Sequence, residues 1–128
     1  MHEYSVVAEL VEALLPRLEE HEGQVTAVHL KKGELRILSD RALINAFEIV
    51  SRETRLEGAS LEIESIPVSV VCERCGYEGA VKTLEDEAFH FAVPILSCPV
   101  CGADVNVISG RELSVERVSM RTAAGETG

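Results

Sequence analysis

The sequence predicts an α+β fold with two helices, several short strands and a small cysteine-rich module inserted before the last strand. Three observations lead to this prediction: apolar residues at helical spacing in two segments, alternating apolar and polar residues in others, and two Cys-x-x-Cys-Gly motifs. With 128 residues, the chain can hold one domain, or a small domain that carries a metal-held module. The predicted order is helix, strand, helix, strand, inserted module and returning strand.

The first helix is predicted to start at Glu3 and to reach about Glu20, because apolar residues recur three and four positions apart. Pro16 removes one backbone donor and crowds the preceding turn, so we expect the helix to kink or end near Leu15. Gly23 marks the end of the segment. The apolar stripe consists of Val6, Val7, Leu10, Val11, Leu14, Leu15 and Leu18.

A second helix and a set of short strands follow. Ser39 and Asp40 offer an N-cap for a helix from Ala42 to about Thr54, with apolar residues again at helical spacing. Residues 61–64 alternate apolar and acidic side chains, which is typical of a half-buried strand. The other segments expected to be extended are residues 25–31, 35–38, 68–71, 105–108 and 112–120.

The four cysteines form two knuckles, Cys72-Glu-Arg-Cys75-Gly and Cys98-Pro-Val-Cys101-Gly, with 22 residues between them. Two residues between thiolates let one tight turn direct both sulfurs at a single ion, and the following glycine permits the positive φ that this turn needs. Two such knuckles complete a tetrahedral Cys₄ site, the closed geometry of structural zinc, although iron would suit the same ligands. We expect the metal to fold this module, because the segment has few apolar stripes.

Composition limits the classes of protein to which the chain can belong. Lys and Arg number 12 against 22 Asp and Glu, which gives a formal net charge of −10. Such a surface repels phosphate backbones, so we expect no nucleic-acid partner. Apolar stretches end well before the ~18 residues that span a bilayer, and acidic residues interrupt the segment where a signal peptide needs an apolar run. We therefore expect a cytoplasmic protein that has no membrane partner.

The N-terminal residues carry a second candidate metal site. The amine of Met1, the amide and imidazole nitrogens of His2 and the amide of Glu3 can close adjacent chelate rings on one ion. Four such nitrogens favour a planar site for Ni(II) or Cu(II), and affinity should fall at low pH because the amides must lose protons. Taken alone, a histidine at position 2 is more often a solvated spectator.

An ordered series of short motifs resembles the HypA/HybF family, the nickel metallochaperones of [NiFe]-hydrogenase maturation. Each motif is unspecific by itself, whereas the ordered set is specific and covers nearly the whole chain. The motifs are Met-His-Glu at the start of the first helix, Gly33-Glu34-Leu35, Ala46-Phe47-Glu48, residues 57–63, the two cysteine knuckles, and Ser109-Gly110-Arg111-Glu112-Leu113.

The resemblance implies a nickel-binding α/β domain, residues 1–67 plus 110–122, in which two helices pack on a small, mostly antiparallel sheet. It implies a zinc-binding ribbon at residues 68–109, while the small polar residues 123–128 are expected to form a disordered tail. Met1 and His2 would then hold Ni(II), with Glu3 contributing its amide and its carboxylate as a further candidate. The zinc ligands implied by the resemblance are Cys72, Cys75, Cys98 and Cys101.

The resemblance also implies partners and one further ligand. The nickel would pass to the [NiFe]-hydrogenase large subunit precursor with help from a nickel-inserting GTPase or ATPase accessory protein, and a homodimer is left open. The long interval between knuckles resembles the archaeal-type subset, in which a histidine of the insertion approaches the nickel. His90 is the matching candidate here, and an exposed loop residue is the alternative interpretation.

Two other functions were weighed against nickel transport. An acidic zinc-ribbon module for protein interaction or nucleic-acid binding, without nickel delivery, would explain the knuckles but leave His2 without a role. A redox enzyme built on Cys-x-x-Cys predicts thiols that cycle readily and lose no metal when they are reduced. We find no Ser-His-Asp set, glycine-rich phosphate loop or paired acid, so the chain is not expected to be an enzyme.

Overall fold

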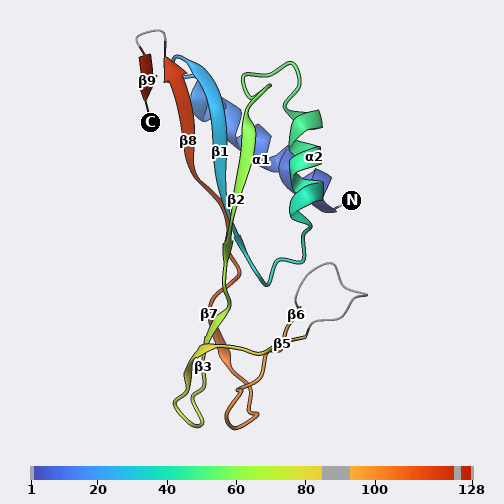
Figure 1. Cartoon of the computed structure of the whole chain (residues 1–128), viewed down its shortest axis with the longest axis vertical. Helices are drawn as coiled ribbons and strands as arrows, with labels where there is room; N and C mark the ends of the chain where they lie inside the picture. Colours follow the sequence, from blue (N-terminus) through green and yellow to red (C-terminus); the bar gives the residue numbers. More distant parts are fainter. Residues whose placement is uncertain (1, 85–92, 123–124, 128) are drawn as a thin grey trace. The chain divides into compact units, whose positions relative to one another are not determined.

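The computed structural model describes residues 2–84, 93–122 and 125–127 (Figure 1). It contains two helices and three small sheets, with strand orders β2-β1-β8-β9, β4-β3-β7 and β5-β6. The predicted α+β class is therefore confirmed. The elements are α1 His2–Leu18, β1 Gln24–Gly33, α2 Asp40–Val50, β2 Ser60–Ile66, β3 Ser69–Val71, β4 Glu78–Ala80, β5 Thr83–Leu84, β6 Val93–Pro94, β7 Asn106–Ser109, β8 Leu113–Thr122 and β9 Gly125–Thr127.

The chain divides into two compact units. The helix unit comprises Met1–Leu30, Leu38–Ile63 and Val115–Gly128, and the cysteine unit comprises Lys31–Ile37 and Glu64–Ser114. Residues 31–37, 64–67 and 110–114, which the sequence-based division places in the nickel-binding domain, group with the cysteine unit. The assignment of nickel and zinc to separate domains stays a prediction.

Helix α1 buries the apolar stripe that the sequence predicts, through Val7, Val11, Leu14 and Leu18. Of the two outcomes expected near Leu15, the end of the helix is wrong, since Pro16 lies inside α1 and the helix ends at Leu18, while the kink stays a prediction. Two features, one burial and one set of hydrogen bonds, explain why the last turn of α1 persists although Pro16 has no amide proton to donate. Leu18 is only 3% exposed. The guanidinium of Arg55 donates to the carbonyl oxygen of Leu18, the last residue of the helix, and to that of Gly23, which adds a side-chain partner to the helix end.

Helix α2 starts at the N-cap that the sequence indicates. Ser39 is extended, with φ −77° and ψ 125°, and its hydroxyl accepts a hydrogen bond from the amide of Ala42. The helix ends at Val50, four residues before the expected Thr54, and turns lead from there to β2. Leu43, Ala46 and Phe47 are buried, α1 packs against α2, and α1 crosses one face of the sheet in Figure 1.

Within the cysteine unit, β3 is the central strand of its sheet. It pairs antiparallel with β4, where Val70 faces Gly79, and with β7, where Val70 faces Val107. Val70 is fully buried. Strands β5 and β6 form a separate antiparallel pair.

Gly33 and Gly110 allow two backbone segments of the cysteine unit to approach closely. A Cβ at Gly33 would overlap with the carbonyl group of Gly110, and Gly110 itself has φ +115°. The amide of Leu35 donates to this same Gly110 carbonyl at 2.8 Å. Glycine is therefore required at Gly33 by space and at Gly110 by conformation.

Of the expected disordered tail, residues 123–128, residues 123, 124 and 128 lie outside the part of the chain that the structure describes. Residues Gly125–Thr127 form β9, which pairs antiparallel with the end of β8, Met120 opposite Thr127. The composition of this segment offers no apolar pattern, so its pairing depends on backbone hydrogen bonds that side-chain periodicity does not report. None of the described helices is long and apolar enough to cross a membrane.

Candidate metal centre

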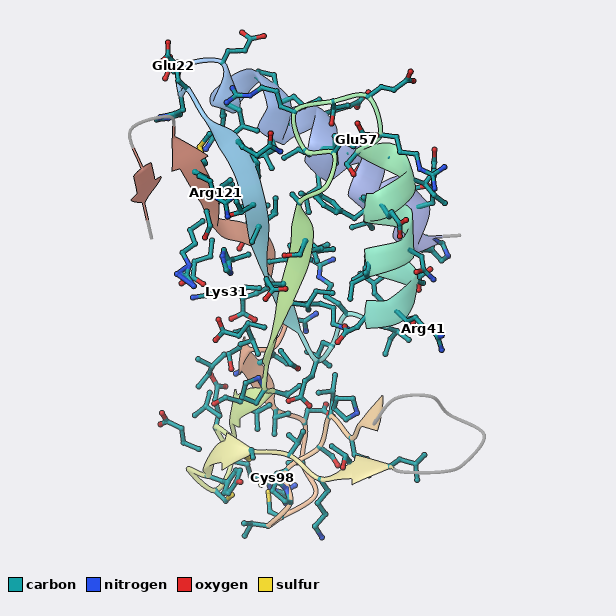
Figure 2. All side chains as sticks on the ribbon, turned by 45° about the horizontal axis from the view of Figure 1, so that its top comes forward. Glu22, Lys31, Arg41, Glu57, Cys98 and Arg121 are labelled. Carbon is teal, nitrogen blue, oxygen red and sulfur yellow. The ribbon has the colours of Figure 1, made fainter. Side chains whose placement is uncertain are left out.

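The four cysteines converge on one point in the cysteine unit. All four sulfur atoms lie within 4.8 Å of one another. The Sγ atoms of Cys72 and Cys101 are 3.6 Å apart, and those of Cys75 and Cys98 are 3.5 Å apart. Cys72 and Cys98, the first cysteines of the two knuckles, are buried, whereas the second cysteines are exposed. Figure 2 labels Cys98 in this cluster.

The backbone of each knuckle follows the same hydrogen-bond pattern. In the first, the amide of Cys72 donates to the carbonyl of Tyr77 at 2.7 Å, and the amide of Gly76 donates to the carbonyl of Cys72 at 2.8 Å. In the second, the amide of Cys98 donates to the carbonyl of Ala103 at 2.8 Å, and the amide of Gly102 donates to the carbonyl of Cys98 at 2.9 Å. Gly76 and Gly102 have φ values of +81° and +78°, as the sequence analysis expects for a glycine behind each knuckle.

The sulfur positions fit a tetrahedral ion. Zinc binds thiolate sulfur at about 2.3 Å, so two ligands of a regular tetrahedron lie about 3.8 Å apart, close to the two distances above. In the second knuckle, the amides of Val100 and Cys101 both donate to the Cys98 sulfur at 3.4 Å. Such bonds satisfy part of the negative charge that a ligating thiolate carries. The four residues together could therefore hold a tetrathiolate metal.

The protonation of the cysteines shows why the cluster favours a cation. Burial opposes ionisation of Cys98, but the backbone amides of Cys101 and Val100 outweigh it and lower the pKa of its thiol to about 6. At Cys75 the backbone of Tyr77 favours the thiolate, yet contacts with the Cys98 sulfur and burial raise the pKa to about 12. Adjacent thiolates repel one another, and a bound dication removes this repulsion.

The second predicted site begins at His2, the first residue of α1, whose side chain is exposed. The first four amides of a helix have no intrahelical carbonyl as partner. A metal could therefore bind the amide of His2 without displacing a hydrogen bond between turns of α1, whereas the amide of Glu3 already interacts with the carboxylate of the same residue. Met1 and His90, the other two candidate ligands, lie outside the described residues.

The carboxylate of Glu3 has a partner that the sequence analysis missed. Its Oε2 accepts a hydrogen bond of 3.0 Å from the backbone amide of Ser39, the N-cap residue of α2. This bond, together with the local backbone of Glu3, lowers the pKa of the Glu3 carboxyl. A carboxylate at a helix N-terminus is favourable, because open amides and the helix dipole attract it. The cap motif at Ser39 was visible in the sequence, but its pairing with Glu3 was not.

Of the remaining histidines, His29 lies on β1. Its Nε2 is 2.9 Å from the hydroxyl of Ser119 on β8. His29 therefore has a hydrogen-bond partner on the neighbouring strand of the same sheet. His21 follows α1, where its amide donates to the carbonyl of Leu18.

A two-helix α+β unit joined to a four-cysteine module defines a small metal-binding protein with a zinc-ribbon type of ligand set. Residues 1–120 match the family model described as "Hydrogenase/urease nickel incorporation, metallochaperone, hypA". The chain therefore belongs to the HypA family of nickel metallochaperones, as its motifs predict.

Individual relatives agree with this family. The chain is 35% identical to the hydrogenase maturation factor HypA of Methanothermobacter thermautotrophicus, over 94% of this chain and 97% of that protein. It is 37% identical to that of Ignicoccus hospitalis, over 91% and 94%. The solution structure of the Ni metallochaperone HypA from Helicobacter pylori has the same fold, with a TM-score of 0.60, 20% identity and coverage of 94% and 97%.

Proposed function

We propose that this chain binds Ni(II) at its N-terminus and delivers it to the [NiFe]-hydrogenase large subunit precursor during maturation. The observation that carries this proposal is the position of His2, whose exposed side chain lies at the first residue of α1, next to Met1 in the chain. The family match to hydrogenase and urease nickel incorporation supports nickel as the cargo.

The proposed ligands are the amine of Met1, the amide and imidazole of His2 and the amide of Glu3. The carboxylate of Glu3 is proposed as a further candidate, although its Oε2 accepts a hydrogen bond from the amide of Ser39. Four nitrogen ligands suit a planar Ni(II) complex. His90 remains proposed as an additional ligand.

Zinc is proposed as the resident ion of Cys72, Cys75, Cys98 and Cys101. Four converging sulfurs and the amides that donate to Cys98 support this assignment. When bound, the ion would crosslink the two knuckles and so stabilise the cysteine unit. The proposed partners for delivery are a nucleotide-hydrolysing, nickel-inserting accessory protein and the large subunit precursor.

The direct test compares the metal content of His2→Ala with that of the wild type by mass spectrometry after nickel loading. We expect the variant to lose stoichiometric nickel and to keep its zinc. His21→Ala is the matched control, since His21 is also an exposed histidine of the helix unit outside the proposed ligand set. Unchanged nickel loading in His2→Ala would overturn the assignment.

A second variant tests the amine. Extending the chain at its N-terminus with a short tag converts the amine of Met1 into an amide and should reduce nickel loading, with zinc unchanged. A tagged protein that loads nickel as well as the native chain would exclude the amine as a ligand.

A further inference from the structure

A groove in the helix unit lies between α2 and β2. It has a volume of about 550 Å³. Phe47 of α2 and Leu61 of β2 contribute to its lining and are almost fully buried, at 2% and 5% exposed. Ile44 also lines the groove and is 43% exposed. The groove thus exposes apolar surface next to a strand.

That strand is at the edge of its sheet. Among the described residues, β1 is the one hydrogen-bonded neighbour of β2 in the order β2-β1-β8-β9. In Figure 1, β2 is the outer strand on the side of α2. The carbonyl of Ile66 faces inward, because it accepts from the amide of Glu34. Backbone groups alternate in direction along a strand, so those of Leu61 and Ile63 are expected to point toward the open edge.

The charge around the groove is predominantly acidic. The side chains of Glu48 and Glu57 line it together with one basic residue, Arg52, and Glu62 of β2 borders it. Glu57 belongs to the loop that joins α2 to β2 (Figure 2). The side chain of Leu61 is buried on the helix side, so the next side chain, Glu62, points to the opposite face. An added strand would therefore meet apolar groups on one face and a carboxylate on the other.

A second copy of this chain is a poor occupant of the edge. If two copies paired through β2 in antiparallel fashion around Ile63, Glu62 of one copy would lie opposite Glu64 of the other. Like charges directly opposite one another destabilise a sheet, and acidic residues on an edge strand act against self-pairing. A strand with basic side chains would instead form favourable cross-strand pairs with Glu62 and Glu64.

We propose that the outer edge of β2 and the groove beside it bind an extended segment of a partner protein in which Lys or Arg alternates with apolar residues. Strand addition supplies backbone hydrogen bonds to Leu61 and Ile63. The apolar side chains enter the groove near Ile44 and Phe47, and the basic ones face the acidic residues. This surface is distinct from the proposed nickel ligands, so it can hold a partner while the cargo is bound.

The test uses a fluorescein-labelled peptide, acetyl-Lys-Val-Lys-Val-Lys-Val-Lys-amide, and measures its binding by fluorescence anisotropy. A peptide of the same composition with all valines in one block controls for charge. We expect the alternating peptide to bind and to slow hydrogen exchange at the amides of Leu61 and Ile63, and the block peptide to bind at least about tenfold more weakly, a difference of about 1.4 kcal/mol. Absence of binding, equal binding of both peptides or unchanged exchange would overturn the proposal.

Matched variants locate the site. Ile44→Glu should weaken peptide binding about tenfold, whereas Ile49→Glu, on the same helix but outside the groove lining, should change it less than about twofold. Equal effects of these two variants would contradict the proposed groove. Nickel loading should remain intact in Ile44→Glu, which separates this proposal from the proposed function.

Charge variants and the oligomeric state complete the test. Glu57→Lys with Glu62→Lys should weaken binding more than Glu9→Lys with Glu12→Lys, which changes the net charge equally on α1. Equal weakening would indicate a diffuse electrostatic attraction and refute a defined site. A dimer that dissociates in Ile44→Glu would assign the edge to a second copy and also refute the proposal.

Discussion

The two regions proposed to bind metal differ in how firmly the backbone holds them. In the cysteine cluster, each knuckle has its own pair of backbone hydrogen bonds and a glycine with positive φ, and two of the four sulfurs are buried. At the start of α1, His2 is exposed, and one bond of Glu3 to Ser39 ties the first turn to α2. A site of the first kind suits a permanent ion, and a site of the second kind suits an ion that must leave.

The largest effect is expected from Cys72→Ser, which removes a buried sulfur from the cluster. The variant should lose zinc and unfold the cysteine unit, because structural zinc contributes about 10 kcal/mol of binding free energy to small sites. Zinc analysis together with amide NMR signals of residues 69–71 and 106–109 measures this. A zinc-free variant with unchanged signals would show that the cluster does not need its ion to fold.

A smaller effect is expected from alanine at either knuckle glycine. Gly76→Ala and Gly102→Ala should each destabilise the zinc-loaded protein by about 1–2 kcal/mol, since a Cβ meets no atom within 4 Å at either position and the cost is the positive φ alone. Urea unfolding measures both. The shared hydrogen-bond pattern predicts equal losses, and markedly unequal ones would show that the knuckles are not equivalent.

The smallest effect is expected at the N-terminus, from Glu3→Gln. At neutral pH the variant should lose about 0.5–1 kcal/mol, because a partly exposed carboxylate loses its charge at the Ser39 amide. The pKa of Glu3 is lowered in the folded chain, so its contribution is present above the ordinary glutamate pKa and is lost as the pH falls through the lowered value. Unfolding curves of the two proteins should converge in acid, and a constant gap would exclude this cause.

The parts of the molecule that follow from local spacing were predictable. The stripe of α1, the cap of α2 and each cysteine knuckle depend on residues a few positions apart. The contacts that the sequence did not reveal join distant positions: Arg55 with the end of α1, and Glu3 with Ser39. The first explains why α1 continues past Pro16. Neither leaves a periodic signal, because one polar residue meeting one backbone group can lie anywhere along the chain.

The close approach of Gly33 to Gly110 has a consequence for anyone who engineers this protein. Any larger residue at position 33 meets main-chain atoms, which no change of rotamer can move aside. We therefore expect that a library in which every position is varied, and which is selected only for soluble protein, retains glycine alone at position 33. A substitution at one of these positions should not compensate for a substitution at the other. A Cβ at Gly33 meets the backbone of Gly110, whereas a Cβ at Gly110 meets Val68.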